Sequence, residues 1–488
     1  MDDAPEPRRF PPWALLAVVC IGQFMVVLDV SIVNVALPAI QRDLKLSTAG
    51  LQWILNAYAL AFGGFLLLGG RAGDLFGRKR MFVVGLALFA GASLVCALAQ
   101  DQATLVAARA LQGLGGAVLS PATLTMITTS YTDPKERGRA LGLWSAMAAA
   151  GGASGALLGG VLTDLLSWRW IFLINVPIGL LTIAAAKAVL TESKGQTTRD
   201  SLDVLGAVTV TGGLVAFVYA VVGTDTHPWG SAATLVPLAV SAVLLAAFAV
   251  VETRPGRVVL VPFRLFRSRA LTGANLAMLM LGGSMFSMWL FLSLYMQDVL
   301  GFSPLRAGVG FLPQTLAIVI GAQISSRLVA RVGPRILLVA GVALAALGLA
   351  WLSRVTAGDT SWTVAFWGGT VATFGMGIAF TPLAYAATTG VEPQQAGLAS
   401  GLLNSARQVG GSLGLAVLAT LAASRTGALR AAHVAPRVAQ TAGFSRAFTI
   451  AAGVALAGVA FGLLVPPPAR PAEAAVSPAP ALALEAER

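Results

Sequence analysis

The sequence contains little charge and almost no cysteine or histidine. Only 11% of its 488 residues are Asp, Glu, Lys or Arg, whereas soluble proteins average about 25%. The two cysteines lie in apolar runs without metal-ligand spacing and the two histidines are isolated, so neither a disulfide framework nor a metal centre is expected. The chain also lacks an H-E-x-x-H motif, a nucleophile elbow with downstream partners and a phosphate-binding loop, which argues against an enzyme and against ATP dependence.

What the sequence has instead is apolar residues, which make up 57% of it. They form fourteen runs of about 20 residues, the length that a helix needs to cross a bilayer. The runs lie near 13–37, 50–69, 81–99, 103–129, 138–162, 169–190, 204–222, 231–251, 270–296, 307–329, 334–352, 364–389, 398–422 and 446–465. The first run has no small-residue cleavage pattern, so we take it as a retained span and not as a signal peptide. The sequence therefore predicts an all-α integral membrane protein.

The net charge is +12, and the Lys and Arg residues follow the pattern that sets the orientation of a membrane protein in the bilayer. Most Lys and Arg fall in the loops that share a side with both termini, and such loops face the cytoplasm. The exception is the loop at about 423–445, with Arg425, Arg430 and Arg437. We expect a multi-pass plasma-membrane protein with both termini cytoplasmic, and we do not expect binding to nucleic acid.

An internal repeat divides the chain into two halves. The stretch ERGRALGLWSAMAAAGGASG (136–155) aligns with QAGLASGLLNSARQVGGSLG (395–414) at an offset of 259, with five coincident glycines. Two parallel six-helix halves are typical of transporters that rock about a central site. The predicted parts are a cytoplasmic N-terminus (1–12), an N-terminal half (13–190), a linker with two additional transmembrane helices (191–269), a C-terminal half (270–465) and a disordered cytoplasmic tail (466–488).

Several motifs occur in the order found in a known family. GGRAGDLFGRKRMF lies between the second and third spans, LVAARALQGLGGA in the fourth and GGASGALLGG in the fifth. These stretches resemble the signature loop, the proton-coupling arginine motif and the antiporter motif of the major facilitator superfamily. With LDVSIVNVALPAI and WRWIFLINVPIG (168–179), the chain resembles the fourteen-span drug:proton antiporters of the EmrB/QacA type.

The resemblance implies proton-coupled efflux of small, largely apolar organic compounds, such as antibiotics or toxic amphiphiles, by alternating access. It also implies a multidrug or antibiotic-resistance role, no cofactor beyond the proton gradient, and a monomer whose partners are its substrate, protons and lipid. A proton-coupled importer of a small nutrient on the same fold is the alternative.

Asp29 lies in the middle of the first span, where a carboxylate costs about 2.5–3.5 kcal/mol on insertion scales and marks a functional candidate. Burial disfavours the charged form of a carboxyl group, so Asp29 can take and release a proton as access to it changes. Arg109 is the only charged residue inside the fourth span. We predict that the two residues couple proton movement to transport; a purely structural ion pair is the alternative.

The loop between the second and third spans is a candidate gate, formed by Gly70, Asp74, Gly77, Arg78 and Lys79. Its glycines permit a tight turn, and its acid can pair with the basic residues. The basic residues can also serve as headgroup anchors.

Glycines recur in the fifth span at the small-xxx-small spacing that lets helices approach closely. The candidates are Gly151, Gly155, Gly159 and Gly160. Ala156 stands where the antiporter motif usually has a proline, so no bend is predicted there.

Polar residues inside the spans are candidates for a substrate cavity. We expect it to be lined by Asn34, Gln52, Asn56, Gln112, Met285, Trp289, Gln314, Tyr385, Asn404 and Arg407. The second half contains no clear intramembrane acid, so proton handling is assigned to the first half.

Overall fold

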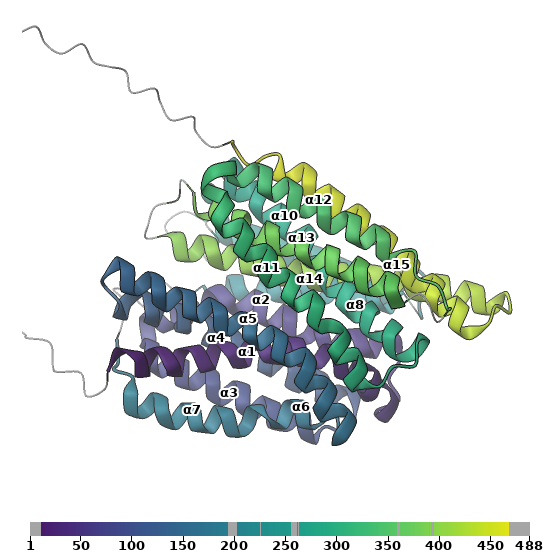
Figure 1. Cartoon of the computed structure of the whole chain (residues 1–488), viewed down its shortest axis with the longest axis horizontal. Helices are drawn as coiled ribbons and strands as arrows, with labels where there is room; N and C mark the ends of the chain where they lie inside the picture. The colour runs from purple at the N-terminus through teal and green to yellow at the C-terminus, as the bar shows by residue number, and fades with distance from the viewer. Residues whose placement is uncertain are drawn as a thin grey trace, which may run out of the picture.

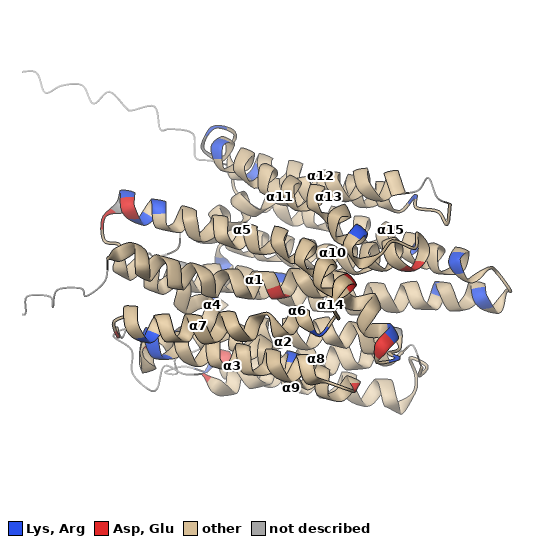
Figure 2. Ribbon diagram, turned by 60° about the horizontal axis from the view of Figure 1, so that its bottom comes forward, with Lys and Arg blue, Asp and Glu red and all other residues tan. Residues whose placement is uncertain are grey.

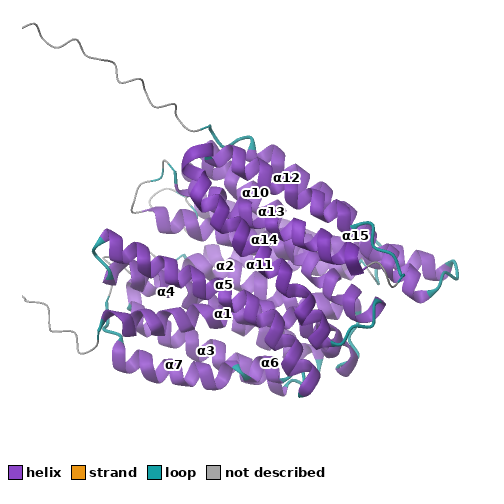
Figure 3. Cartoon of the chain, viewed as in Figure 1, coloured by secondary structure: helices purple, strands orange, loops and turns teal. Residues whose placement is uncertain are grey.

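The computed structural model describes residues 11–193, 203–224, 226–254, 261, 263–358, 362–389, 391 and 395–467. Within these ranges every regular element is a helix (Figure 3). Fourteen of the described helical segments are long and apolar enough to cross a membrane, which confirms the predicted all-α fold. The predicted tail lies almost entirely outside the described residues, as do most of residues 1–12.

The first half contains six spans. They are α1 (Pro12–Asp43), α2 (Thr48–Phe76), α3 (Arg78–Leu98), α4 (Gln102–Ser130), α5 (Pro134–Leu165), and α6 (Trp170–Leu173) followed by α7 (Asn175–Val189). Short polar residues set several starts: the Ser47 side chain accepts a hydrogen bond from the Gly50 N–H, and Asp101 accepts one from Thr104. Such N-caps satisfy backbone donors that have no partner within the helix.

The remaining spans belong to the linker and to the second half. The linker contributes α8 (Val204–Gly223) and α9 (Ala232–Thr253), and η2 (Phe263–Arg267) leads into the second half. That half contains α10 (Arg269–Leu294) with the π-turn η3 (Tyr295–Val299), α11 (Pro304–Val332), α12 (Pro334–Leu352), α13 (Trp362–Thr388), α14 (Ala396–Ala431) and α15 (Pro436–Gly462). Both α14 and α15 reach into the loop predicted at 423–445, which reduces the connection between them to four residues.

The two halves pack their helices in the same way (Figure 1). In the first half α1 packs on α5, α2 on α4 and α3 on α4, and in the second α10 packs on α14, α11 on α13 and α12 on α13. The halves meet along two seams, one between α5 and α11 and the other between α2 and α14. This arrangement confirms the two pseudo-symmetric halves that the repeat predicts.

The additional pair of spans covers one seam only. Helix α8 packs against both α2 and α14, and α9 packs on α8. Val218 and Val221 of α8 join Leu60 and Ala416 in one buried apolar cluster. The linker therefore packs across the α2/α14 seam. The α5/α11 seam is formed by contacts between the two halves alone.

Charge is distributed along the long axes of the helices as a bilayer requires. Figure 2 shows Lys, Arg, Asp and Glu mostly near the helix ends, with long uncharged stretches between them. Large apolar side chains such as Leu181, Val243 and Leu347 are exposed on the outer faces. Exposed apolar surface of this extent is typical of a membrane interface. Pro12 and Gly462 lie at the same end of the bundle (Figure 1), which we call the terminal end.

Candidate functional site

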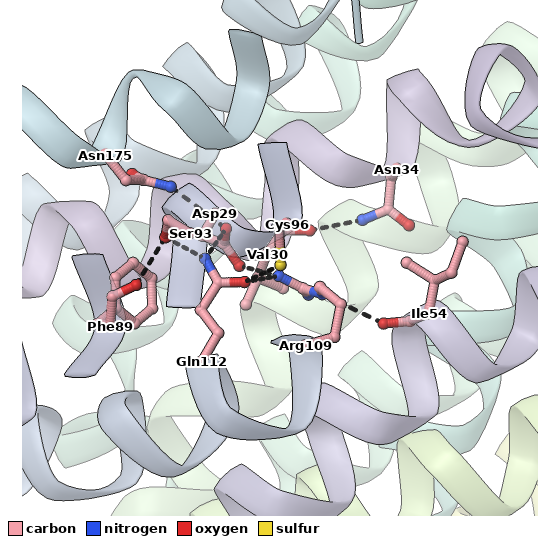
Figure 4. A network of polar contacts seen from close by, with 10 residues as sticks. All are labelled: Asp29, Val30, Asn34, Ile54, Phe89, Ser93, Cys96, Arg109, Gln112 and Asn175. Carbon is pink, nitrogen blue, oxygen red and sulfur yellow. Dashed lines mark hydrogen bonds and ion pairs between the residues drawn. The ribbon is translucent and has the colours of Figure 1, made fainter. Parts of the chain in front are cut away.

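Asp29 and Arg109 form a fully buried ion pair between α1 and α4 (Figure 4). The Arg109 Nη1 lies 2.6 Å from the Asp29 Oδ2, and the two side chains are 1% and 0% exposed. Arg109 Nε also donates to the Ile54 carbonyl at 3.2 Å. The guanidinium lies 4.3 Å from the ring centroid of Tyr58, so a cation–π contact supports it from α2.

Amide side chains complete the surroundings of Asp29. Gln112 Nε2 donates to Asp29 Oδ1 at 2.7 Å, and Asn175 Nδ2 lies 3.4 Å from the same oxygen. The Gln112 Oε1 accepts from Arg109, and its Nε2 also contacts the Ser93 hydroxyl. Arg109, Gln112 and Asn175 all act as donors to Asp29, so the arrangement fits the ionised carboxylate.

This network has the properties of a switchable site. Breaking a buried pair by removing one partner costs about 3–5 kcal/mol, because it leaves an uncompensated charge. Protonation of Asp29 removes its charge in the same way, and would release Arg109 unless another anion or water takes its place. A proton on Asp29 and the position of Arg109 are therefore linked.

Two adjoining cavities lie between the halves. The first encloses about 390 Å³ and is lined by Val30, Asn34, Leu55, Tyr58, Ala59, Arg109, Phe286, Trp289 and Gln408. The second encloses about 300 Å³ and is lined by Ser31, Asn34, Val35, Ala156, Trp289, Phe311, Gln314 and Thr315. Asn34 and Trp289 belong to both linings, so the two form one central region. Arg109 binds Asp29 and also lines this region, which places the ion pair in the wall of the cavity.

The predicted cavity residues fall into four groups. Asn34, Trp289 and Gln314 line the cavities, and Gln112 belongs to the Asp29 network instead. Gln52, Asn56 and Met285 are buried without lining either cavity. Tyr385 is 52% exposed, Asn404 is exposed and Arg407 is half-buried. Tyr58 and Phe286 were not predicted, since an aromatic residue in an apolar span gives no sign of the face on which it lies.

Several buried polar atoms near this region have no hydrogen-bond partner within the described part of the chain. They include Tyr58 Oη, Trp289 Nε1, Gln314 Oε1, Arg407 Nε, Gln52 Oε1 and both amide atoms of Asn56. Buried polar groups are nearly always hydrogen-bonded in proteins. Their concentration here indicates a region that binds water or a polar ligand.

We call the end of the bundle opposite the terminal end the far end. On that side the central region is closed by contacts of α1 with the end of α10 and with η3. Ser293 Oγ donates to the Asn34 carbonyl at 2.7 Å, and Gln297 Nε2 donates to the Val35 carbonyl at 2.8 Å. On the α5/α11 seam, Gly160 packs against Pro304, also near the far end. Towards the terminal end of α5, a Cβ added at Gly138 or Gly142 would meet no described atom within 4 Å.

Three of the four predicted glycines of α5 lie against α1 near Asp29, whereas Gly160 packs against α11. A Cβ at Gly155 would lie 2.6 Å from the Ser31 Cβ, one at Gly151 would lie 2.9 Å from the Phe24 carbonyl oxygen, and one at Gly159 would lie 2.7 Å from the Ile32 carbonyl oxygen. In the second half, Gly410 and Gly414 make the equivalent close approach to α10. The glycine repeat therefore creates the same helix contact twice, as expected of small-residue packing.

The motif WRWIFLINVPIG connects two parts of the first half. Trp168 Nε1 and Arg169 Nη1 donate to Asp43 Oδ2 at 2.9 and 2.6 Å, which fastens the far end of α1. Six residues after Arg169, Asn175 reaches Asp29. The break in helix between Leu173 and Asn175 lies next to this contact.

The candidate gating loop forms a tight corner at the terminal end. Asp74 accepts hydrogen bonds from Arg78, with a shortest distance of 2.8 Å, and Gly77 has φ of 107°. The carboxylate of Glu192, which was not predicted, accepts from the N–H groups of Lys79 and Arg80, both at 3.1 Å. An acid at a helix N-terminus accepts hydrogen bonds from the free backbone N–H groups and interacts favourably with the positive end of the helix dipole. Glu192 therefore stabilises the start of α3.

The linker spans place two buried acids near this corner. Asp203 and Glu252 are 2% and 5% exposed, and both carboxylates lie within 3.0 Å of the position that a Cβ on Gly206 would occupy. Their charges act on Arg71, close to the gating loop. The linker therefore contacts the first half electrostatically as well as through apolar packing.

Gly77 and Gly73 provide a matched pair for testing the corner. We expect Gly77→Ala to destabilise the protein by about 1–3 kcal/mol, because its φ is left-handed and its new Cβ would meet the Glu192 carboxylate. Gly73→Ala should be neutral or slightly stabilising, because a Cβ there meets nothing within 4 Å and alanine favours a helix. Thermal unfolding in detergent measures both; equal stability of the two variants would contradict the structure of the corner.

Among the described residues, no group of three or more His, Cys, Asp and Glu side chains is placed to hold a metal ion.

A family model of the Major Facilitator Superfamily matches residues 19–415. The chain therefore belongs to this superfamily of membrane transporters.

Two relatives of this chain are named for antibiotic export or resistance. The chain is 46% identical to the cephamycin export protein CmcT of Amycolatopsis lactamdurans, over 84% of this chain and 85% of that protein. It is 40% identical to the puromycin resistance protein pur8 of Streptomyces alboniger, over 93% and 89% of the two chains. A solved bacterial homologue of the human lysosomal transporter Spinster, in an inward-facing and unoccupied conformation, shares the fold with a TM-score of 0.66 at 18% identity, over 95% of this chain and 98% of that one.

Proposed function

We propose that the protein exports small, largely apolar organic compounds of the antibiotic class in exchange for protons. The observation that carries this proposal is Arg109, which binds the buried Asp29 and also lines the central cavity. The 46% identity to a cephamycin export protein supports an efflux direction.

The exchange follows from the shared arginine. With Asp29 ionised and paired, Arg109 is held in place in the cavity wall by the ion pair. Protonation of Asp29 weakens the pair and lets Arg109 and Tyr58 move, which alters the cavity wall on which a compound rests. Entry of one proton across about 100 mV and one pH unit supports a concentration ratio of a few hundred for a neutral compound at one-to-one exchange.

The orientation of the cycle is also a proposal. The distribution of Lys and Arg supports a plasma-membrane protein with both termini in the cytoplasm. The terminal end then faces the cytoplasm, and the contacts of Ser293 and Gln297 with α1 close the extracellular side. Asp74, Arg78 and Lys79 act as the cytoplasmic gate, and the α5 glycines provide the surface on which α1 moves.

Trp289 is the aromatic wall of the proposed binding region, because it lines both cavities. We expect Trp289→Ala to weaken substrate binding by about 10- to 100-fold, as loss of a buried aromatic contact does at other binding sites. Trp289→Phe retains a ring and should restore most of the affinity. Unchanged binding of puromycin to the alanine variant, measured by calorimetry on the purified protein, would place the substrate elsewhere.

The function is tested by uptake into everted membrane vesicles. We expect labelled puromycin, or a cephamycin, to accumulate when the vesicle lumen is acidic and to leave when the gradient is collapsed by an ionophore. The alternative, a nutrient importer, predicts instead that labelled sugar exchanges across the vesicle membrane while the antibiotics have no effect.

A further inference from the structure

Arg407 is a cation in the membrane-spanning part of the chain for which the described residues provide no counter-ion. Asp29 and Arg109 neutralise each other at 2.6 Å. Arg407, on α14, makes no hydrogen bond or ion pair with any described residue, and its Nε is buried. An unpaired, half-buried charge within a membrane-spanning helix is costly unless a ligand or water compensates it.

The position of Arg407 connects it to the central cavity. The next residue, Gln408, lines the first cavity, and the backbone of Arg407 packs directly against Gly282 of α10. The charge of Arg407 acts on Tyr58, another lining residue. Asn404, one turn towards the terminal end, is exposed. Arg407 therefore lies between the terminal end and the cavity, on the path that we propose for substrate entry.

Three of the free polar groups around this place are able to donate a hydrogen bond. Tyr58 Oη, Trp289 Nε1 and Arg407 Nε all lack an acceptor. A carboxylate has only acceptor atoms, and its hydrogen bonds with charged donors are the strong ones. The apolar side chains of Leu55 and Phe286 complete the lining, which suits an organic body attached to the acid.

We infer that the exported compounds include organic monocarboxylates, and that Arg407 binds their carboxylate. The inference rests on the proposed efflux function and specifies its substrate class. The charges balance as follows: one proton moves inward from outside while one organic anion moves outward, so the membrane potential acts on two charges in each cycle. Export of such an anion should therefore depend more steeply on membrane potential than export of an uncharged compound.

The test compares an acid with its neutral ester. The probes are cefoxitin, a cephamycin with one carboxylate, and cefoxitin methyl ester, with binding measured by calorimetry on the purified full-length protein. We expect the acid to bind about 10- to 100-fold more tightly than the ester, the range of a charge-assisted contact at a partly buried site. Arg407→Gln should abolish this preference, and Arg407→Lys should retain part of it.

Two controls make the result specific. Arg306→Gln removes the same charge at the far end of the bundle, where Arg306 stacks on Phe302, and should leave the preference unchanged. Puromycin, which has no carboxylate, should bind Arg407→Gln as it binds the parent protein, which shows that the variant is folded. Equal affinity of the parent for acid and ester, absence of binding by both, or a preference that survives in Arg407→Gln would overturn the inference.

The failure of this inference is distinguishable from failure of the proposed function. Proton-driven accumulation of puromycin with equal binding of acid and ester would leave the efflux function standing and reject only the carboxylate assignment. Binding of cefoxitin through Arg407 without proton-driven accumulation of either compound would keep the anion site and reject antiport.

Discussion

Asp29→Asn should abolish transport driven by a pH gradient while leaving the substrate cavity in place. Asparagine has nearly the shape of aspartate and can still contact Gln112 and Asn175, but it cannot carry a proton on and off. Accumulation of puromycin in everted vesicles should fall to the level of vesicles without the protein. Binding to the purified variant should change by less than about 10-fold, because Asp29 itself does not line either cavity and, of the lining residues, only Arg109 loses an ion-pair partner.

The same substitution should destabilise the protein, which provides an independent check on the ion pair. Removing one member leaves Arg109 buried without a partner, at a cost of up to about 3–5 kcal/mol. Asp29→Asn combined with Arg109→Gln removes both charges and should recover much of this loss without restoring transport. A double variant that transports as the parent does would assign proton coupling elsewhere and leave the pair a structural role.

Gly155→Ala should have the second large effect, because its new Cβ has no room. It would lie 2.6 Å from the Ser31 Cβ and 2.9 Å from the Leu28 carbonyl oxygen. Overpacking of this kind costs about 1–3 kcal/mol, and here it pushes α5 away from the part of α1 that carries Asp29. We expect loss of most transport and a lower unfolding temperature, with a larger loss for Gly155→Leu.

Gly152 provides the matched control for this contact. It lies three residues away on the same helix, but a Cβ there would approach its nearest neighbour, Val27, only to 3.9 Å. Gly152→Ala should therefore keep both transport and stability. If the alanine variants at 152 and 155 behave alike, the close approach of α5 to α1 has no role in transport.

The sequence was most informative where the bilayer imposes a simple rule. Runs of about 20 apolar residues predicted the spans, because a helix of that length satisfies its own backbone in lipid. The aligned glycines predicted two similar halves, and the structure shows Gly151 and Gly410 in equivalent contacts. Asp29 and Arg109 stood out because few charged residues lie within spans, and they are indeed partners at 2.6 Å.

The details of the cavity were harder to predict. A buried helix is apolar on every side, so residue type alone does not indicate which face a polar side chain occupies. Gln112 was assigned to the cavity but lies on the Asp29 network, and Tyr385 is exposed on α13. Tyr58 and Glu192 were missed because their roles depend on contacts with distant helices, Arg109 in one case and the start of α3 in the other.

The most direct test of the central claim is proton movement triggered by the substrate. The purified protein is reconstituted into vesicles that contain a pH-sensitive dye, puromycin is added on one side, and the dye signal is followed without an imposed gradient. The proposed mechanism predicts proton movement opposite in direction to puromycin in the parent protein and none in Asp29→Asn. Puromycin movement without proton movement, or equal proton movement in both proteins, would contradict it.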